Sequence, residues 1–245
     1  TRMKAVKLQK SSFRLHLPLA VRYVPMGMTS FLSQISVVAS MAAVQNMTMK
    51  YGALDPIFGQ EGLTQIPMAV LGIVMKFFQI VIAFAVGFSA GCIPVVGYNI
   101  GAGRKDRAKK LFKMLLGAEL ATGLVALAIV EGLPGQLIRL FGAAGESAYY
   151  TEFAVRCFRV YLCMLPLATI NKGTFIYLQA LGKAALSSGI SLVREIVFGC
   201  GLPILLPVFF GLNGVLYSMP VADALTFVIA AVVIACVMKQ LDAKN

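Results

Sequence analysis

Six ionisable side chains stand within long apolar stretches of this sequence: Lys76, Glu119, Lys172, Arg194, Glu195 and Asp223. At bilayer depth a charged side chain costs about 2.5–3.5 kcal/mol on insertion scales, so such residues pair with one another or handle an ion, a proton or a substrate. Three bases against three acids is the balance expected of ion pairs between helices. The alternative is that some of these residues line a central cleft and meet a substrate or a proton.

Position along the chain adds detail to both interpretations. Counted from the ends of the apolar stretches, Glu119, Lys172, Arg194 and Glu195 are expected at similar, middle depths. Arg194 and Glu195 are adjacent and would point about 100° apart on an α-helix, which predicts at least two different partners. A third interpretation is a lipid-facing charge that reaches the membrane surface, and it fits Lys76 best because of the long stem of that side chain.

Uncharged polar residues also stand in apolar stretches: Gln34, Gln45, Asn46, Gln79, Asn171 and Gln179. The candidates for a substrate or cation pathway are therefore Gln34, Glu119, Asn171, Lys172, Arg194, Glu195 and Asp223. For the uncharged polar residues, hydrogen bonds between helices are the favoured explanation, and a polar lining of a ligand cleft is the alternative. Twelve Met and sixteen Phe residues suit either an adaptable apolar pocket or lipid contact.

The elements that must position these residues are membrane helices. The chain of 245 residues is 59% hydrophobic and only 13% charged, and its mean hydropathy is +0.83. A soluble domain carries about 25% charged residues, whereas ~20 apolar residues suffice to cross a bilayer. The sequence therefore predicts an all-α integral membrane fold. A single His supplies no nucleophile–base pair and no zinc site, so we expect no enzyme.

Six spans are predicted, at residues 23–49, 62–103, 108–133, 150–181, 185–209 and 214–238. The second is too long for one straight crossing at 1.5 Å per residue, so we expect it to bend near Pro94. Kinks are also expected at Pro25, Pro67 and Pro203. The chain divides into a basic, amphipathic lead-in, a six-helix transmembrane lobe and a tail, at residues 1–20, 21–239 and 240–245.

Basic residues favour one side of these spans. The segments that six crossings place with the termini hold fifteen Lys and Arg residues, whereas the opposite segments hold four. By the positive-inside rule, both termini are cytoplasmic. The net charge of +12 then reflects orientation in the membrane, and we expect no binding to nucleic acid.

The stretch GYNIGAGRKDRAKK, residues 97–110, combines glycines with basic residues. Such a turn could cradle a phosphate, but the GxxxxGK[ST] arrangement is missing and no strand precedes it. Glycines also let the chain turn sharply where a helix ends, and basic residues anchor a loop at anionic headgroups. The stretch is therefore predicted to be a cytoplasmic loop.

Four stretches, in the right order, resemble the multidrug and toxic compound extrusion (MATE) transporters. CIPVVGYNIGAGRKDRAKK is similar to a cytoplasmic loop of that family, and GMTSFLSQISVVASMAAVQNMTMKYG is compatible with its seventh helix. LQALGKAALSSGISLVREIVFGCGLPILLP resembles its tenth and eleventh helices, and FGLNGVLYSMPVADALTFVIA its last helix. Together these stretches cover nearly the whole chain.

The resemblance implies that the chain is a C-terminal lobe, half of a twelve-helix transporter with two lobes. The beginning at Thr1 fits that expectation. The implied function is cation-coupled antiport, with Na⁺ or H⁺, that exports amphipathic and often cationic drugs and toxins by alternating access. The implied partners are a small-molecule substrate, the lipid bilayer and the missing N-terminal lobe. The implied location is a bacterial inner (plasma) membrane.

The acids of some family branches are absent here. Those branches bind the coupling cation with a Glu on the seventh helix and an Asp on the tenth. The corresponding helices of this chain carry Gln34 and Asn171, followed by Lys172. This resembles the branches close to MepA and DinF, whose essential acid is on the first helix of the N-lobe. The coupling site would then lie in the missing lobe, and this chain would bind no cofactor.

A lipid-linked oligosaccharide flippase of the same superfamily is the alternative function. Such flippases often carry several cationic residues in the cavity that receives the pyrophosphate. The buried charges of this sequence are balanced rather than cationic, which favours drug export.

Overall fold

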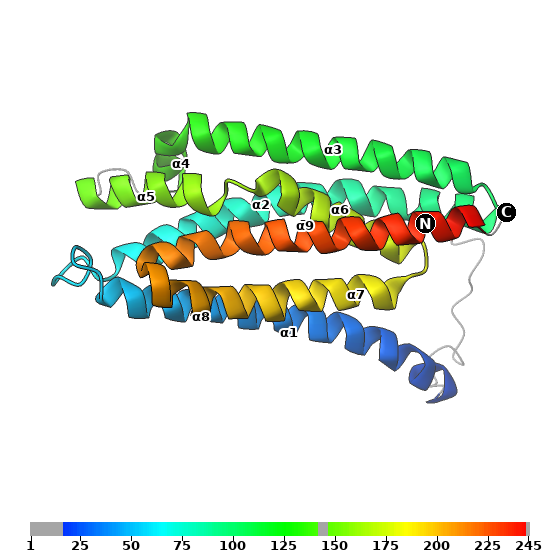
Figure 1. The fold of residues 1–245 in the computed structure, drawn as a ribbon, viewed down its shortest axis with the longest axis horizontal. Coiled ribbons are helices and arrows are strands. Elements are labelled where there is room, and N and C mark those ends of the chain that lie inside the picture. Colours follow the sequence, from blue (N-terminus) through cyan, green and yellow to red (C-terminus); the bar gives the residue numbers. More distant parts are fainter. Residues whose placement is uncertain (1–16, 142–146, 244–245) are drawn as a thin grey trace, which may run out of the picture.

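The computed structural model describes residues 17–141 and 147–243, with side chains from residue 31 to 241. These residues form helices joined by turns, with no strand among them, and the helices run along one common axis (Figure 1). The predicted all-α fold is confirmed. The helices are α1 Leu17–Ala53, α2 Ile66–Gly101, α3 Lys105–Gly132, α4 Pro134–Leu140, α5 Ala148–Tyr161, α6 Leu165–Ala180, α7 Ala184–Leu192, the π-helix η2 Val193–Phe198, α8 Gly199–Phe210 and α9 Leu212–Ala243.

Most of the predicted membrane spans are long and apolar enough to cross a bilayer. Among the described residues, α2, α3, the continuous run α7–η2–α8 and α9 meet that requirement, and the bent pair α5–α6 adds a fifth. The first predicted span, residues 23–49, lies in α1 and is not among them. Polar residues such as Gln34, Gln45 and Asn46 lower the hydropathy of its described part. Its crossing therefore stays a prediction.

The predicted fourth span, residues 150–181, is broken into two helices. α5 ends at Tyr161, and α6 begins at Leu165 with a bend of 46° between them. Pro166 stands in the first turn of α6, where a proline is tolerated, and it disfavours helical backbone in the residue before it. The proline therefore separates two helices where the sequence analysis predicted one.

The other prolines act in two ways. Pro94 lies inside α2 and Pro203 inside α8, and the kinks expected at these two residues stay predictions. Pro67 stands in the first turn of α2, where proline starts a helix rather than kinking it, so the kink predicted there was wrong. The predictions for the lead-in, residues 1–16, lie outside the described residues. The side chain of Pro25 lies outside the described side chains.

The turns alternate between the two ends of the bundle. The α2–α3 and α6–α7 turns lie at the end where α9 finishes, and the α1–α2 loop and the α8–α9 turn lie at the other end (Figure 1). Lys183 Nζ donates to Gln240 Oε1 at 2.6 Å and so joins the α6–α7 turn to α9. Gly103 and Gly182 end the preceding helices with φ of +71° and +76°, a backbone region that favours glycine. The basic turn after Gly103 therefore lies at the same end of the bundle as the α6–α7 turn with Lys183, as the predicted sidedness requires (Figure 1).

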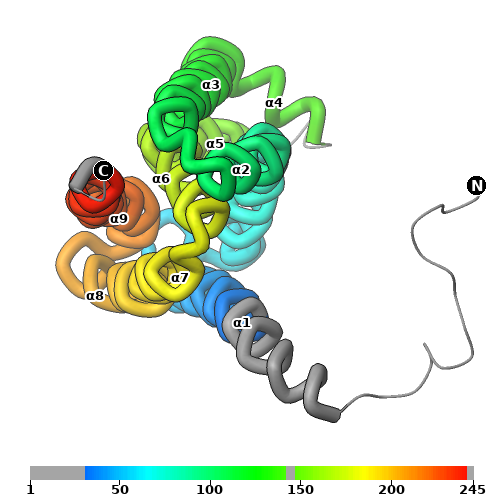
Figure 2. Tube along the Cα trace, turned by 90° about the vertical axis from the view of Figure 1, so that its right-hand side faces the viewer, coloured from blue at the N-terminus to red at the C-terminus, as the bar shows by residue number. Residues whose placement is uncertain are grey.

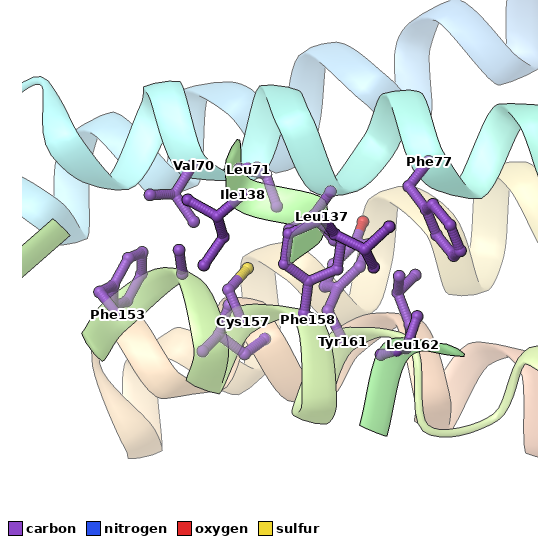
Figure 3. Packing of buried hydrophobic residues seen from close by; sticks show 14 of the residues in the cluster. Val70, Leu71, Phe77, Leu137, Ile138, Phe153, Cys157, Phe158, Tyr161 and Leu162 are labelled. Carbon is purple, nitrogen blue, oxygen red and sulfur yellow. The ribbon is translucent and has the colours of Figure 1, made fainter. Parts of the chain in front are cut away.

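α6 is the helix on which the other elements converge. It packs against α2, α3, α7 and α9, and the end-on view shows it between these neighbours (Figure 2). A hydrophobic core between α2, α4 and α5 holds the segment before it (Figure 3). Cys157 and Phe158 of α5 are fully buried there, and Phe153 packs edge-to-face on Phe58 with ring centroids 4.8 Å apart. Packing of α5 thus fixes where α6 begins.

Candidate functional site

A cavity of about 360 Å³ lies between α1, α2, α6, the η2–α8 run and α9. Most of its wall is apolar and flexible, with Met41, Met75 and Met219 among the lining side chains. Three charged side chains also reach it: Lys172 from α6, and Arg194 and Glu195 from η2. Small-molecule sites are concave, mainly apolar and carry a few polar groups in a volume of about 300–1,000 Å³. This larger cavity has those properties.

A smaller cavity of about 270 Å³ adjoins the larger one. Lys172 of α6 and Val86 of α2 line both cavities. The rest of its wall is more polar and includes Gln34, Gln179 and Ser188. The two cavities together, called the cleft below, place Lys172 at the junction between an apolar half and a polar half.

Arg194 holds two acids in the wall of the cleft. Its Nε and Nη2 donate to Asp223 Oδ1 at 3.2 and 2.8 Å, and its Nη1 donates to Glu195 Oε1. These three residues, called the Arg194 triad below, are buried: Arg194 is 7% exposed, Glu195 5% and Asp223 2%. One base against two acids leaves the triad with one negative charge in excess when all three are ionised.

At least two different contacts were predicted for Arg194 and Glu195. The two residues bind each other directly, which the sequence analysis did not foresee, and Arg194 adds Asp223 as a further partner. They stand in the π-helix η2, whose hydrogen bonds run from i to i+5, so the angle between neighbouring side chains differs from that of an α-helix. A single π-turn in a helix is frequently found at functional sites, and this one faces the cleft.

Lys172 is the second base of the cleft and lies outside the Arg194 triad. No ion pair or hydrogen bond of its ammonium group is recorded among the described residues. The charges of Arg194, Glu195 and Asp223 nevertheless act on it. Its excess of one positive charge balances the excess negative charge of the triad, so the four charges cancel without direct contact to Lys172.

Glu119 lies on a different side of α6. It is fully buried, and Ser89 Oγ donates to its Oε1 at 2.6 Å. Thr169 Oγ1 donates to its backbone carbonyl at 2.8 Å, while its Oε2 has no hydrogen-bond partner among the described residues. A Cβ on Gly173 would come within 2.8 Å of Glu119 Cγ. Neither cavity of the cleft is lined by Glu119.

The remaining predicted residues fall into three surroundings. Gln34 is exposed and lines the smaller cavity. Asn171 is buried, and its Nδ2 donates to the carbonyl of Asp223 at 3.0 Å, which joins α6 to α9. Lys76 is exposed on α2, in agreement with a lipid-facing position. The structure therefore brings together Gln34, Lys172, Arg194 and Glu195 at the cleft, with Asp223 and Asn171 behind its wall.

Sequence reasoning missed the surroundings of Glu119. Ser89, Thr169 and Gly173 were not among the predicted site residues, although all three contact Glu119. Small residues in apolar helices indicate that neighbouring helices approach closely. That signal was available at Gly123 as well, because a Cβ there would come within 2.4 Å of Pro166 Cα.

A protein-family comparison matches residues 25–204 to the model of the MatE family. A comparison with curated proteins finds no match. Solved structures match more widely. A MOP superfamily transporter from Pyrococcus furiosus matches with a TM-score of 0.81 at 15% identity, over 97% of this chain and 50% of that chain.

Two conformations of a multidrug resistance MATE family transporter also match. The outward-facing structure has a TM-score of 0.81 at 16% identity, over 98% of this chain and 51% of that one. The inward-facing structure has a TM-score of 0.82 at 16% identity, over 97% and 52%. At such identities the likeness shows a shared fold, and the chain spans about half the length of the proteins it matches.

Proposed function

This chain belongs to the MatE family, and from that premise we propose that it forms one lobe of a membrane transporter that exports amphipathic compounds. Transport would be driven by an inward gradient of Na⁺ or H⁺. The observation that carries the proposal is the cleft, an apolar cavity with Met and Phe side chains and a small number of charged groups. Met-rich, flexible walls can repack around ligands of different shape.

The lobe would work with a second lobe, the N-terminal one that the resemblance implies. Its likeness to both an outward-facing and an inward-facing transporter supports a lobe that keeps its fold while the two lobes rock about a cleft between them. The positive-inside distribution supports cytoplasmic termini in a multi-pass inner (plasma) membrane protein.

The coupling cation would bind outside this lobe. Gln34 and Asn171 stand where some branches of the family carry acids, and neither ionises. Two of the intramembrane acids, Glu195 and Asp223, are engaged by Arg194. These engagements support a coupling site in the N-terminal lobe, as in the branches close to MepA and DinF.

Charge balance favours this function over a lipid-linked oligosaccharide flippase. A pyrophosphate carries several negative charges and needs several unpaired cations around it. In and behind the cleft wall, the two bases Lys172 and Arg194 face the two acids Glu195 and Asp223. Their sum is zero when all are ionised, which suits a ligand with an apolar body and at most one charged group.

Dye export tests the proposal. Cells that lack their own efflux pumps would express this chain together with its N-terminal lobe, and loss of N-phenyl-1-naphthylamine and ethidium from preloaded cells would be followed by fluorescence. We expect export that stops when an uncoupler collapses the ion gradient. The chain expressed without the second lobe is the control and should export neither dye. Absence of export by the complete pair at normal membrane abundance would contradict the proposal.

A further inference from the structure

The charged groups of the cleft differ in whether they have hydrogen-bond partners. Arg194 occupies Asp223 Oδ1 with two hydrogen bonds and Glu195 Oε1 with a third. Lys172 lines both cavities, and its three N–H donors take no part in any ion pair recorded for the described residues. Lys172 is half-buried, so its charged group is open to the two cavities that it lines. The cleft therefore offers hydrogen-bond donors to an acceptor group of a ligand.

The Arg194 triad acts in the same cleft. Glu195 lines the larger cavity together with Lys172, but both acids of the triad already accept hydrogen bonds from Arg194, which leaves Lys172 as the cation available to a ligand.

The two cavities suit two different parts of a ligand. The larger cavity has apolar side chains such as Phe78, Ile82 and Phe198 in its wall, which suit an apolar body. On the other side of Lys172, the smaller cavity offers the amide of Gln34 and the hydroxyl of Ser188, which can donate to further oxygen atoms of a head group.

We propose that the cleft recognises amphiphiles by an anionic head group at Lys172, with the apolar body in the larger cavity and the remaining head-group oxygens in the smaller one. The inference rests on the proposed function, since it names the substrate class of the same cleft. It selects carboxylates, sulfonates or phosphate esters with one apolar group. The ligand is an exported compound rather than a bilayer lipid, because cavities of about 360 and 270 Å³ hold a drug-sized molecule and not two acyl chains.

A matched pair of fluorescent probes tests this inference. 8-Anilinonaphthalene-1-sulfonate and N-phenyl-1-naphthylamine share one ring system and differ by the sulfonate. The full chain would be placed in nanodiscs of neutral phosphatidylcholine and titrated with each probe, and the signal of empty nanodiscs would be subtracted. We expect the sulfonate probe to bind the wild type more tightly than the neutral probe.

Variants of Lys172 provide the decisive comparison. Lys172→Met should weaken sulfonate binding by about ten- to a hundredfold, the range expected when a charge-assisted hydrogen bond is lost, and should leave neutral-probe binding within about twofold. Lys172→Arg should retain most of the sulfonate affinity, which guards against a general loss of structure. Lys76→Met removes an exposed lysine of α2 and should change neither affinity. Equal weakening of both probes, or unchanged sulfonate binding in Lys172→Met, would overturn the inference.

The source of the anion is tested in the same assay. Nanodiscs that contain phosphatidylglycerol should give the same sulfonate affinity as those of phosphatidylcholine alone. Weaker sulfonate binding in the anionic nanodiscs, seen in the wild type but not in Lys172→Met, would overturn the assignment to an exported compound and make a lipid the occupant. Because the assay reads binding, its outcome is independent of whether the dye-export experiment succeeds.

Discussion

Lys172 and Gly173 are neighbours on α6, yet they belong to two regions of opposite character. Lys172 faces two cavities and has room around its charge. Gly173 faces Glu119, where a single added methyl group would come within 2.8 Å of a side-chain carbon. Both regions hold charges in apolar helices, but only Lys172 lines the two cavities of the cleft. The comparison teaches that a charge at bilayer depth indicates function when it faces a cavity, and helix packing when its surroundings are filled.

The closed region owes its character to small residues. Ser89 on α2 and Gly173 on α6 let these helices approach Glu119 of α3 closely, and Gly123 does the same beside Pro166. In membranes, close backbone approach and hydrogen bonds between helices stabilise packing, because the hydrophobic effect does not act between helices there. We therefore expect the Glu119 region to serve stability and the Lys172 region to serve binding.

The largest loss of stability is expected when the ion pairs in the cleft wall are broken. Arg194→Leu would leave Glu195 and Asp223 buried without their base, and breaking a buried pair by removing one partner costs about 3–5 kcal/mol. Unfolding of the purified chain in detergent, followed by circular dichroism, would measure the loss. Arg139→Leu, at an exposed position on α4, is the control and should change little. An Arg194→Leu variant as stable as the wild type would refute the structural role of the triad.

The closed region should resist any added volume. Gly123→Ala would push a methyl group into the backbone of Pro166, and overpacking of this kind costs about 1–3 kcal/mol. Gly117 of the same helix has open space around it, so Gly117→Ala should be neutral or slightly stabilising. The same unfolding assay separates the two variants. Similar stabilities for both would show that the Glu119 region is less tightly packed than the contacts indicate.

A smaller loss is expected when only a hydrogen bond is removed from the closed region. Ser89→Ala takes away the donor to Glu119 Oε1, and a typical hydrogen bond contributes about 1 kcal/mol. Ser188→Ala, in the wall of the smaller cavity, is the matched control and should unfold like the wild type. If Ser188→Ala were the more damaging change, the division into a packed and an open region would be reversed.

The smallest effect on stability is expected at Lys172. Its ammonium group has no recorded contact with the described residues that its loss would leave unpaired, so Lys172→Met should change the free energy of unfolding by at most about 0.5 kcal/mol. A large loss of stability would show that Lys172 holds the helices together, and would contradict a role in binding.

The relative position of the charged residues along the helix bundle agrees with the sequence analysis, whereas the direction of their side chains could not be predicted. Glu119 contacts Gly173, the neighbour of Lys172, and Lys172 shares a cavity with Arg194 and Glu195, which agrees with the similar depths expected for these four residues. Depth follows from counting residues at a constant rise. Direction needs an unbroken helical register, and Pro166 and η2 both interrupt that register. The difference between the Lys172 region and the Glu119 region therefore could not be predicted from the sequence and is seen only in the structure.

The predicted all-α architecture depended on hydropathy, which survives such interruptions. Apolar content over about 20 residues is unaffected by one π-turn or one proline. The first span is the exception, because polar residues in α1 weaken the same signal. Features set by single contacts, such as Ser89 against Glu119, have no periodic signal in the sequence.

Export of an anionic dye tests the contrast between the two regions most directly. Inside-out membrane vesicles that contain this chain with its N-terminal lobe would be energised and given the monoanion 8-anilinonaphthalene-1-sulfonate. Its accumulation in the vesicles, which reports export, would be followed for the wild type, Lys172→Met and Glu119→Gln at equal membrane abundance. We predict that Lys172→Met abolishes most of the export, whereas Glu119→Gln, which keeps an acceptor for Ser89, retains it. Export lost in Glu119→Gln and preserved in Lys172→Met would contradict the account.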